Sequence, residues 1–117
     1  PMGLTRAFTP LLKQSDDASV LFVSESHSEK AQAYWGGFGA SKAAVNYLAL
    51  SIADEWERFD NLRANILIPG AVNSPQREKT HPGESKSERR EPADIMPAFI
   101  YWLGSESKGR NGETVYL

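Results

Sequence analysis

Two short apolar segments constrain the fold of this chain more than any other feature. Residues 19–24 and residues 62–68 are short runs dominated by apolar side chains, with several β-branched ones among them. Runs of this kind are typical of strands that are buried on both faces, and such strands belong to parallel sheets. The long segment between the two runs leaves room for the helical crossover that parallel strands need. The sequence therefore predicts an α/β fold.

Apolar residues at helical spacing surround these two runs. Their recurrence at positions i, i+3, i+4 and i+7 predicts amphipathic helices. The expected helices cover residues 4–13, 38–59 and 93–103, and a last short strand covers residues 114–117. Alternation of helices and strands predicts a parallel sheet of three strands in chain order, with three helices packed on it.

A strongly charged segment interrupts the second half of the chain. Residues 76–92 contain no apolar residue but carry five basic and four acidic side chains. A segment of this composition does not bury itself. Within a single domain of residues 1–117, we therefore expect residues 76–92 to form a charged lid or a disordered loop.

Composition excludes several classes of protein. The 117 residues include 13 basic and 15 acidic side chains, a balance that gives no reason to expect a nucleic acid or membrane partner. Cysteine is absent, which excludes disulfides and thiol catalysis, and no apolar run is long enough to span a bilayer. By elimination we expect a cytoplasmic protein. Glu25, His27 and Glu29 alternate in a polar loop without fixed geometry, so we expect no metal site.

Two motifs stand at the ends of predicted elements. Phe-Gly-Ala-Ser-Lys opens the long helix at Phe38, and Asn-Ile-Leu-Ile-Pro-Gly-Ala-Val-Asn-Ser covers residues 65–74. In this order they resemble the Tyr-x-x-x-Lys and Asn-x-x-x-Pro-Gly-x-Val-x-Thr motifs of the short-chain dehydrogenase/reductase family. Residues 34–37 and 92–97 resemble its bacterial YciK-type branch. The resemblance implies that the chain is the C-terminal half of a Rossmann-like, doubly wound parallel sheet.

The resemblance also implies which residues stand at the catalytic positions. The family uses a tyrosine as general acid and base, a lysine that lowers the tyrosine pKa, and a serine that polarises the substrate carbonyl. Lys42 matches the lysine, but Phe38 stands at the tyrosine position and Glu25 at the serine position. Ser24 and Ser26 flank Glu25, and either would supply the serine hydroxyl if the match to the family shifts by one residue. We therefore expect impaired carbonyl chemistry.

The same resemblance implies NAD or NADP as the cofactor. The residues implied to contact its nicotinamide end are Lys42, Pro69, Gly70, Ala71, Val72 and Ser74. The Pro-Gly pair is also consistent with a simple turn that ends a strand. Because the sequence lacks a glycine-rich turn for the pyrophosphate, we expect this chain alone not to bind the dinucleotide.

Two hypotheses for the function follow. The first is an oxidoreductase relative with impaired activity, either as this chain alone or as a piece of a full oxidoreductase whose other half supplies the dinucleotide site. The alternative is a non-catalytic dimerisation or small-ligand-binding module derived from the same fold. In the family, two helices of this half pack against their copies in a second subunit. The resemblance thus implies a homo-oligomer, formed through the helix from Leu4 to Lys13 and the helix from Phe38 to Phe59.

Overall fold

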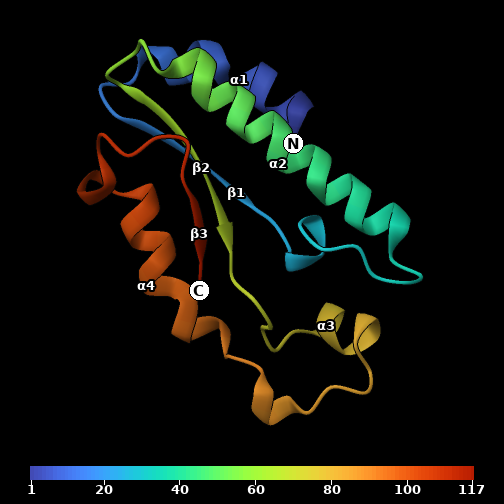
Figure 1. Cartoon of the computed structure of the whole chain (residues 1–117). Coiled ribbons are helices and arrows are strands. Elements are labelled where there is room, and N and C mark those ends of the chain that lie inside the picture. The colour runs from blue at the N-terminus through green and yellow to red at the C-terminus, as the bar shows by residue number, and fades with distance from the viewer.

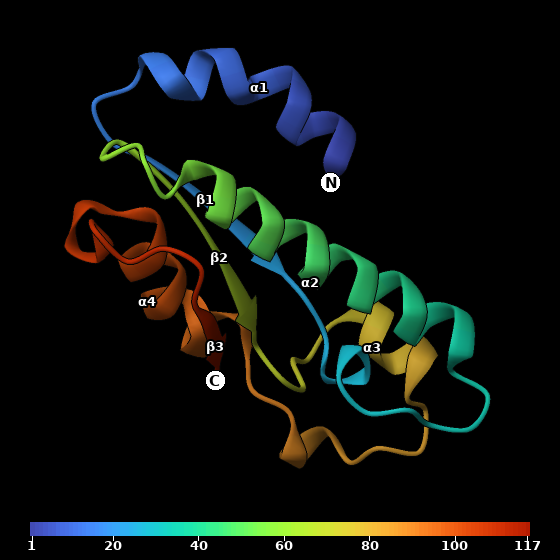
Figure 2. The same cartoon turned by 45° about the horizontal axis from the view of Figure 1, so that its top comes forward.

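The computed structural model describes residues 1–117, apart from the side chain of His27. It contains a three-stranded sheet with helices on both faces (Figures 1 and 2). The strands are β1 (Ala18–Val23), β2 (Leu62–Ile68) and β3 (Thr114–Tyr116). The helices are α1 (Met2–Gln14), α2 (Gly36–Trp56), α3 (Pro75–Thr80) and α4 (Pro92–Leu103). Short 3-10 turns cover Ser26–Ser28, Lys86–Glu88 and Ser105–Ser107.

The sheet has the predicted order and direction. Strand β2 lies between β1 and β3 and is parallel to both, with Ala18 opposite Leu62 and Ile66 opposite Thr114. Helices α1 and α2 lie on one face of the sheet, and α4 lies on the other (Figures 1 and 2). This arrangement confirms the α/β fold class. It differs from the expectation in one element, because α3 is a fourth helix that lies inside the charged segment.

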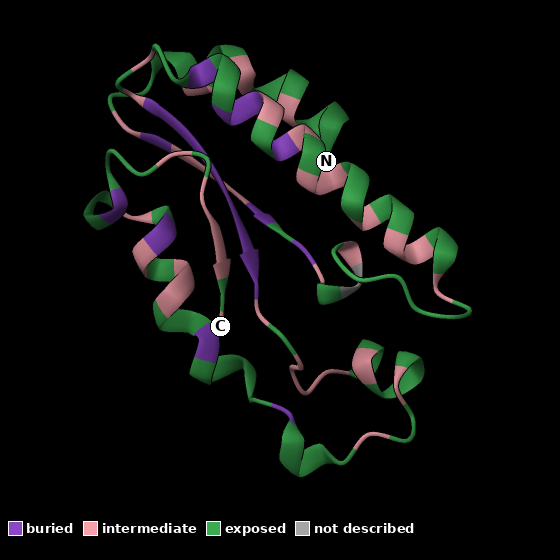
Figure 3. Ribbon diagram, viewed as in Figure 1, coloured by how far each residue is buried: buried purple, intermediate pink, exposed green. Residues whose placement is uncertain are grey.

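Strand β2 forms the centre of the core. All seven of its residues are buried (Figure 3). Side chains alternate between the two faces of a strand. The face that includes Leu62 and Ile66 packs into the main apolar cluster with α2, which contributes Ala49, Ile52 and Trp56. Burial of apolar area of this kind supplies most of the stability of the fold.

The opposite face of β2 carries two buried polar side chains. Arg63 forms an ion pair with Asp17 and donates to the carbonyl oxygen of Gly104. Asn65 donates to the carbonyl oxygen of Arg110 and accepts from the backbone N–H of Glu113. The bonds to Gly104, Arg110 and Glu113 connect the central strand to the segment between α4 and β3. They pair most of the polar atoms whose burial is otherwise costly, although the Nε atom of Arg63 has no partner.

Helix boundaries differ slightly from the predicted ones. Helix α2 begins at Gly36 rather than Phe38 and ends at Trp56 rather than Phe59. Its last turn is closed by short-range backbone bonds, including one from the N–H of Phe59 to the carbonyl oxygen of Trp56, which end the helix. Among the described residues, no helix combines the length and apolarity needed to cross a lipid bilayer.

The turn after β2 depends on a glycine. Gly70 has a φ of +77°, a left-handed conformation that costs a residue with a Cβ about 1–2 kcal/mol. We expect Gly70→Ala to lower the free energy of unfolding by about that amount, measured by urea denaturation followed by circular dichroism. Gly83→Ala is the matched control, because Gly83 has no positive φ and open space around its Cα. Equal stability of the two variants would contradict the strain argument.

Candidate active site

A small cleft lies beyond the carboxyl ends of β1 and β2. Its volume is about 200 Å³, and its residues come from the segments that follow these strands, from α2 and from α3. The lining residues are Glu25, Lys42, Pro69, Gly70, Val72, Ser74, Gln76, Arg77 and Thr80. In open α/β sheets, ligands bind outside the carboxyl ends of the strands, so this is the expected place for a binding site.

Six of the residues singled out from the sequence line this cleft together. They are Glu25, Lys42, Pro69, Gly70, Val72 and Ser74. The other four, Ser24, Ser26, Phe38 and Ala71, are not among its lining residues. Ser24 is buried, with its N–H bonded to the carbonyl oxygen of Leu67, whereas Ser26 is exposed. The group that reaches the cleft from this segment is therefore a carboxylate rather than a hydroxyl.

Phe38 and Lys42 lie one turn apart near the start of α2. The Nζ atom of Lys42 lies 5.6 Å from the centroid of the Phe38 ring, a cation–π arrangement. The ring of Trp35 meets Phe38 edge-on at 5.4 Å. Tyr34, the tyrosine nearest in sequence, is fully exposed and has a φ of 70°, so its hydroxyl does not lie in the cleft.

A network of charges organises the charged segment over the cleft. The Nε and Nη2 atoms of Arg77 donate to the two carboxylate oxygens of Glu84, at 2.8 and 2.9 Å. Arg89 donates to the same carboxylate at 3.0 Å and also to the carbonyl oxygen of His81. The hydrogen bond from Arg77, helped by the bond from Arg89, lowers the pKa of Glu84 to about 2.

Backbone and aromatic contacts fix both ends of this segment. Val72 forms a parallel bridge with Arg90, in which the N–H of Arg90 donates to the carbonyl oxygen of Ala71. At its tip, His81 stacks on Trp35 with ring centroids 5.1 Å apart. The segment is thus joined to the turn after β2, which supplies four of the lining residues, and to the start of α2, which supplies Lys42.

Three lining residues were missed by sequence reasoning. Gln76, Arg77 and Thr80 reach the cleft because residues 75–80 form the short helix α3. A local signal for this helix is present: the Ser74 side chain caps it by accepting from the N–H of Arg77, and Pro75 occupies the first helical position. The lack of apolar periodicity hid the helix, since no face of it is buried.

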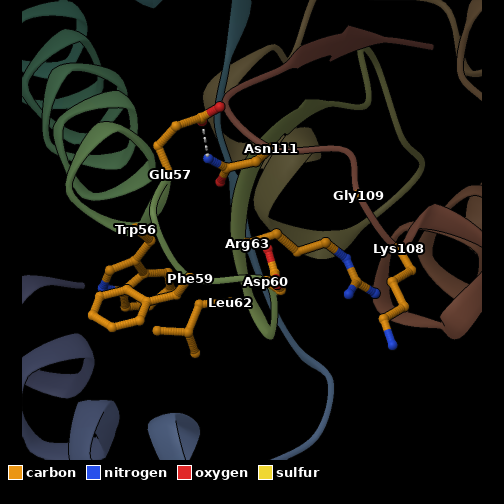
Figure 4. Close-up of a pocket in the computed structure, with 9 residues that line it drawn as sticks. All are labelled: Trp56, Glu57, Phe59, Asp60, Leu62, Arg63, Lys108, Gly109 and Asn111. Carbon is orange, nitrogen blue, oxygen red and sulfur yellow. Dashed lines mark hydrogen bonds between the residues drawn. The ribbon is translucent and has the colours of Figure 1, made fainter.

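A second pocket, of about 310 Å³, lies near the amino end of β2 (Figure 4). Its walls include Trp56, Phe59 and Leu62 on one side and Arg63 with Lys108 on the other. Asn111 spans this region, with its amide nitrogen donating to the carbonyl oxygen of Ala53 and to the Glu57 carboxylate. These contacts tie α2 to the segment before β3, which is a structural role.

The cleft lining offers backbone groups and an ammonium group but no phosphate cradle. Pro69, Gly70 and Val72 provide backbone at the rim, and Lys42 provides an ammonium group with no ion-pair partner among the described side chains. A pyrophosphate is typically held at the amino end of a helix that follows a glycine-rich turn after a strand. None of the described strands is followed by such a turn.

Comparison with known proteins identifies the family of this chain. The family model for short chain dehydrogenases matches residues 1–85, well over half of the chain. The chain therefore belongs to the short-chain dehydrogenase family.

Individual relatives extend the likeness beyond residue 85. The oxidoreductase YciK of Escherichia coli K12 is 36% identical over 111 residues, which is 95% of this chain and 43% of YciK. A short chain dehydrogenase structure from Pseudomonas syringae is 42% identical, with a TM-score of 0.93, over 98% of this chain and 47% of the other. One from Escherichia coli CFT073 in complex with NADPH is 35% identical, with a TM-score of 0.91 and the same coverage. The chain thus spans less than half the length of these relatives.

The low pKa of Glu84 makes the charged segment sensitive to acid. The bonds from Arg77 and Arg89 to the ionised Glu84 carboxylate stabilise the folded segment. Because the folded-state pKa of Glu84 lies below the ordinary value of 4.5, this contribution to stability is complete above pH 4.5 and is lost as the pH falls through about 2. We expect the amide protection factors of residues 76–90, which are corrected for the intrinsic pH dependence of exchange, to fall over that range. At neutral pH, Glu84→Gln should speed up exchange in the same residues.

Glu78→Gln is the matched control for this experiment. Glu78 lies in the same segment and pairs with Lys86, but both side chains are exposed. Exposed pairs contribute little to stability. Equal exchange in the Glu84→Gln and Glu78→Gln variants would show that the Arg77–Glu84–Arg89 network does not hold the segment.

Proposed function

We propose that this chain forms the nicotinamide-side half of an oxidoreductase site whose carbonyl chemistry is impaired. The observation that carries the proposal is the identity of two side chains around the cleft. Phe38 stands one turn before Lys42, where the family has its tyrosine, and Glu25 reaches the cleft where the family has its serine. We assign the other groups of that site to Lys42 and to the Pro69–Gly70 turn, all of which line the cleft.

The loss of the hydroxyl removes the proton source. Reduction of a carbonyl leaves an oxyanion that needs a proton, and a positioned acid contributes about 10²–10⁴-fold to the rate. The Phe38 ring has no ionisable proton and packs against Trp35 and under the ammonium of Lys42. Lys42 is then left without a phenol whose pKa it would lower.

The carboxylate of Glu25 opposes the same reaction. An oxyanion is stabilised by donors aimed at the place where negative charge develops. An ionised carboxylate has no proton to donate and repels that charge. Two independent replacements, Glu25 in the cleft and Phe38 beside Lys42, thus act in the same direction, against carbonyl reduction.

A nicotinamide cofactor would supply the reducing equivalent. The NADPH-bound relative from Escherichia coli CFT073 supports this choice for the family. In this chain, Lys42 and the backbone around Gly70 are the groups that would hold the nicotinamide side. We expect the chain alone to show no saturable binding of NADH or NADPH by nicotinamide fluorescence.

A chimera tests the proposed impairment. In it, this chain replaces the matching C-terminal half of Escherichia coli YciK, so that YciK supplies the other half. We expect the chimera to bind NADPH but to oxidise it slowly with a panel of small ketones and aldehydes. The double substitution Phe38→Tyr and Glu25→Ser should raise the rate by about 10²-fold or more.

The two single variants separate the contributions of the hydroxyl and the carboxylate. An unsubstituted chimera as fast as the doubly substituted one would overturn the impairment. A double variant that binds cofactor and carbonyl but stays inactive would show that Phe38 and Glu25 do not occupy the catalytic positions.

A specific observation also favours self-association as a second function. Helix α2 exposes Tyr47, which is 75% accessible, together with Leu50, its neighbour on the same face. Helix α1 has no buried residue and exposes Leu4, Phe8 and Leu11. Apolar helical faces of this kind mark interaction surfaces. We propose a homodimer formed through α1 and α2.

Introducing a charge into this apolar face tests the dimer. We expect the purified chain to be a dimer by light scattering after size-exclusion chromatography, and Tyr47→Glu to shift it to the monomer mass. Ile100→Glu is the matched control, since Ile100 is 72% accessible but lies on α4, on the other face of the sheet. The interface would be refuted by a parent chain that is monomeric at all concentrations, or by equal loss of the dimer in the Tyr47→Glu and Ile100→Glu variants.

A further inference from the structure

The cleft presents charges of both signs on side chains that form no ion pair with one another. Glu25 lines it from the segment after β1, while Lys42 lines it from α2 and Arg77 from α3. Neither Glu25 nor Lys42 has an ion-pair partner within 4.0 Å among the described side chains. The two opposite charges thus face one small cavity without neutralising each other directly.

Arg77 adds a fixed positive group to the same cavity. Its Nε and Nη2 atoms are bonded to Glu84, which holds the guanidinium in place. Its pKa is raised, first by the hydrogen bond with Glu84 and further by the negative charges of Glu84 and Glu25. The negative charge of Glu25 therefore acts on Arg77 across the cleft, although the two side chains form no ion pair.

The remaining lining is polar and the space is limited. Ser74, Gln76 and Thr80 contribute hydroxyl and amide groups around the charges. The volume of about 200 Å³ is below the ~300–1,000 Å³ of sites for drug-sized ligands. A small ligand that carries both charges matches this cavity, since each of its charged groups then lies near a side chain of opposite charge.

We propose that the cleft binds a small zwitterion, an amino or imino acid, with its protonated nitrogen towards Glu25 and its carboxylate towards Lys42 and Arg77. The proposal rests on the proposed function, because it assigns a ligand class to the same cleft. It also gives the carboxylate at position 25 a role: the group that repels an oxyanion attracts a protonated nitrogen. The Lys42 ammonium has three donors, so it can meet the ligand carboxylate and still reach the nicotinamide side, while the Pro69–Gly70 rim is left to the nicotinamide ring.

Three probes with the same five-membered ring test the charge requirement. L-Proline is the zwitterion, pyrrolidine carries only the positive charge, and cyclopentanecarboxylate carries only the negative charge. The purified chain is titrated with each at pH 7 and low salt, without dinucleotide. The readout is the ¹⁵N–¹H spectrum, in which the amides of Gly70, Val72, Ser74 and Arg77 report on the cleft.

We expect saturable shifts of these amides with proline, and a dissociation constant at least about tenfold lower than for either singly charged probe, as charged hydrogen bonds of this strength allow. Glu25→Gln should bring proline to the affinity of cyclopentanecarboxylate. Lys42→Met should weaken proline binding in the direction of pyrrolidine, although Arg77 still meets the carboxylate. Glu78→Gln is the control, because Glu78 lies on α3 outside the cleft and should leave all three affinities unchanged.

Three results would overturn the proposal. They are equal affinity of the three probes, tighter binding of cyclopentanecarboxylate than of proline, and no saturable shift at the cleft with any probe. A retained spectrum outside the cleft confirms that each variant is folded. The outcome is independent of the YciK chimera, which measures turnover. If proline does not bind, the proposal of impaired carbonyl chemistry is unaffected. If the unsubstituted chimera turns over rapidly, the proposal of a zwitterionic ligand is unaffected.

Discussion

Burial of β2 on both faces and along both edges is the constraint on which this structure depends. All seven residues from Leu62 to Ile68 are buried, because β1 and β3 pair with the strand while helices cover the sheet. Apolar side chains fill one face. On the other face, Arg63 pairs with Asp17 and Asn65 donates to the carbonyl oxygen of Arg110. The helices and strands that surround β2 are positioned by this one strand, and the cleft forms where it ends.

The cleft depends on a second, electrostatic arrangement. Backbone after β2 supplies one wall, and the charged segment supplies the other through Arg77. One carboxylate, Glu84, accepts bonds from two arginines and holds that segment in its folded path. A chain with no apolar residue in this segment can thus be ordered by charge pairing, whereas Glu25 and Lys42 remain uncommitted in the cavity.

Much of the fold could be predicted from the sequence, and part of the site could not. The strands were predictable because their apolar runs differ from everything around them, and Lys42 and Gly70 were predictable from motifs at the ends of elements. The short helix α3 was missed because it lacks apolar periodicity, and its one local signal is the Ser74 cap followed by Pro75. Arg77 enters the cleft only through that helix, and its distance from Glu25 in sequence leaves no local signal.

The parallel direction of all three strands has a kinetic consequence. Parallel neighbours cannot be joined by a tight hairpin, so β1 and β2 meet only after the whole of α2 has been traversed, and β3 joins after α3 and α4. Closing such long loops costs chain entropy before any ladder bond forms. A protein of this size with so few local strand pairings folds slowly for its length. During that interval the apolar residues of β2 are open to other chains, so its refolding yield should fall as protein concentration rises.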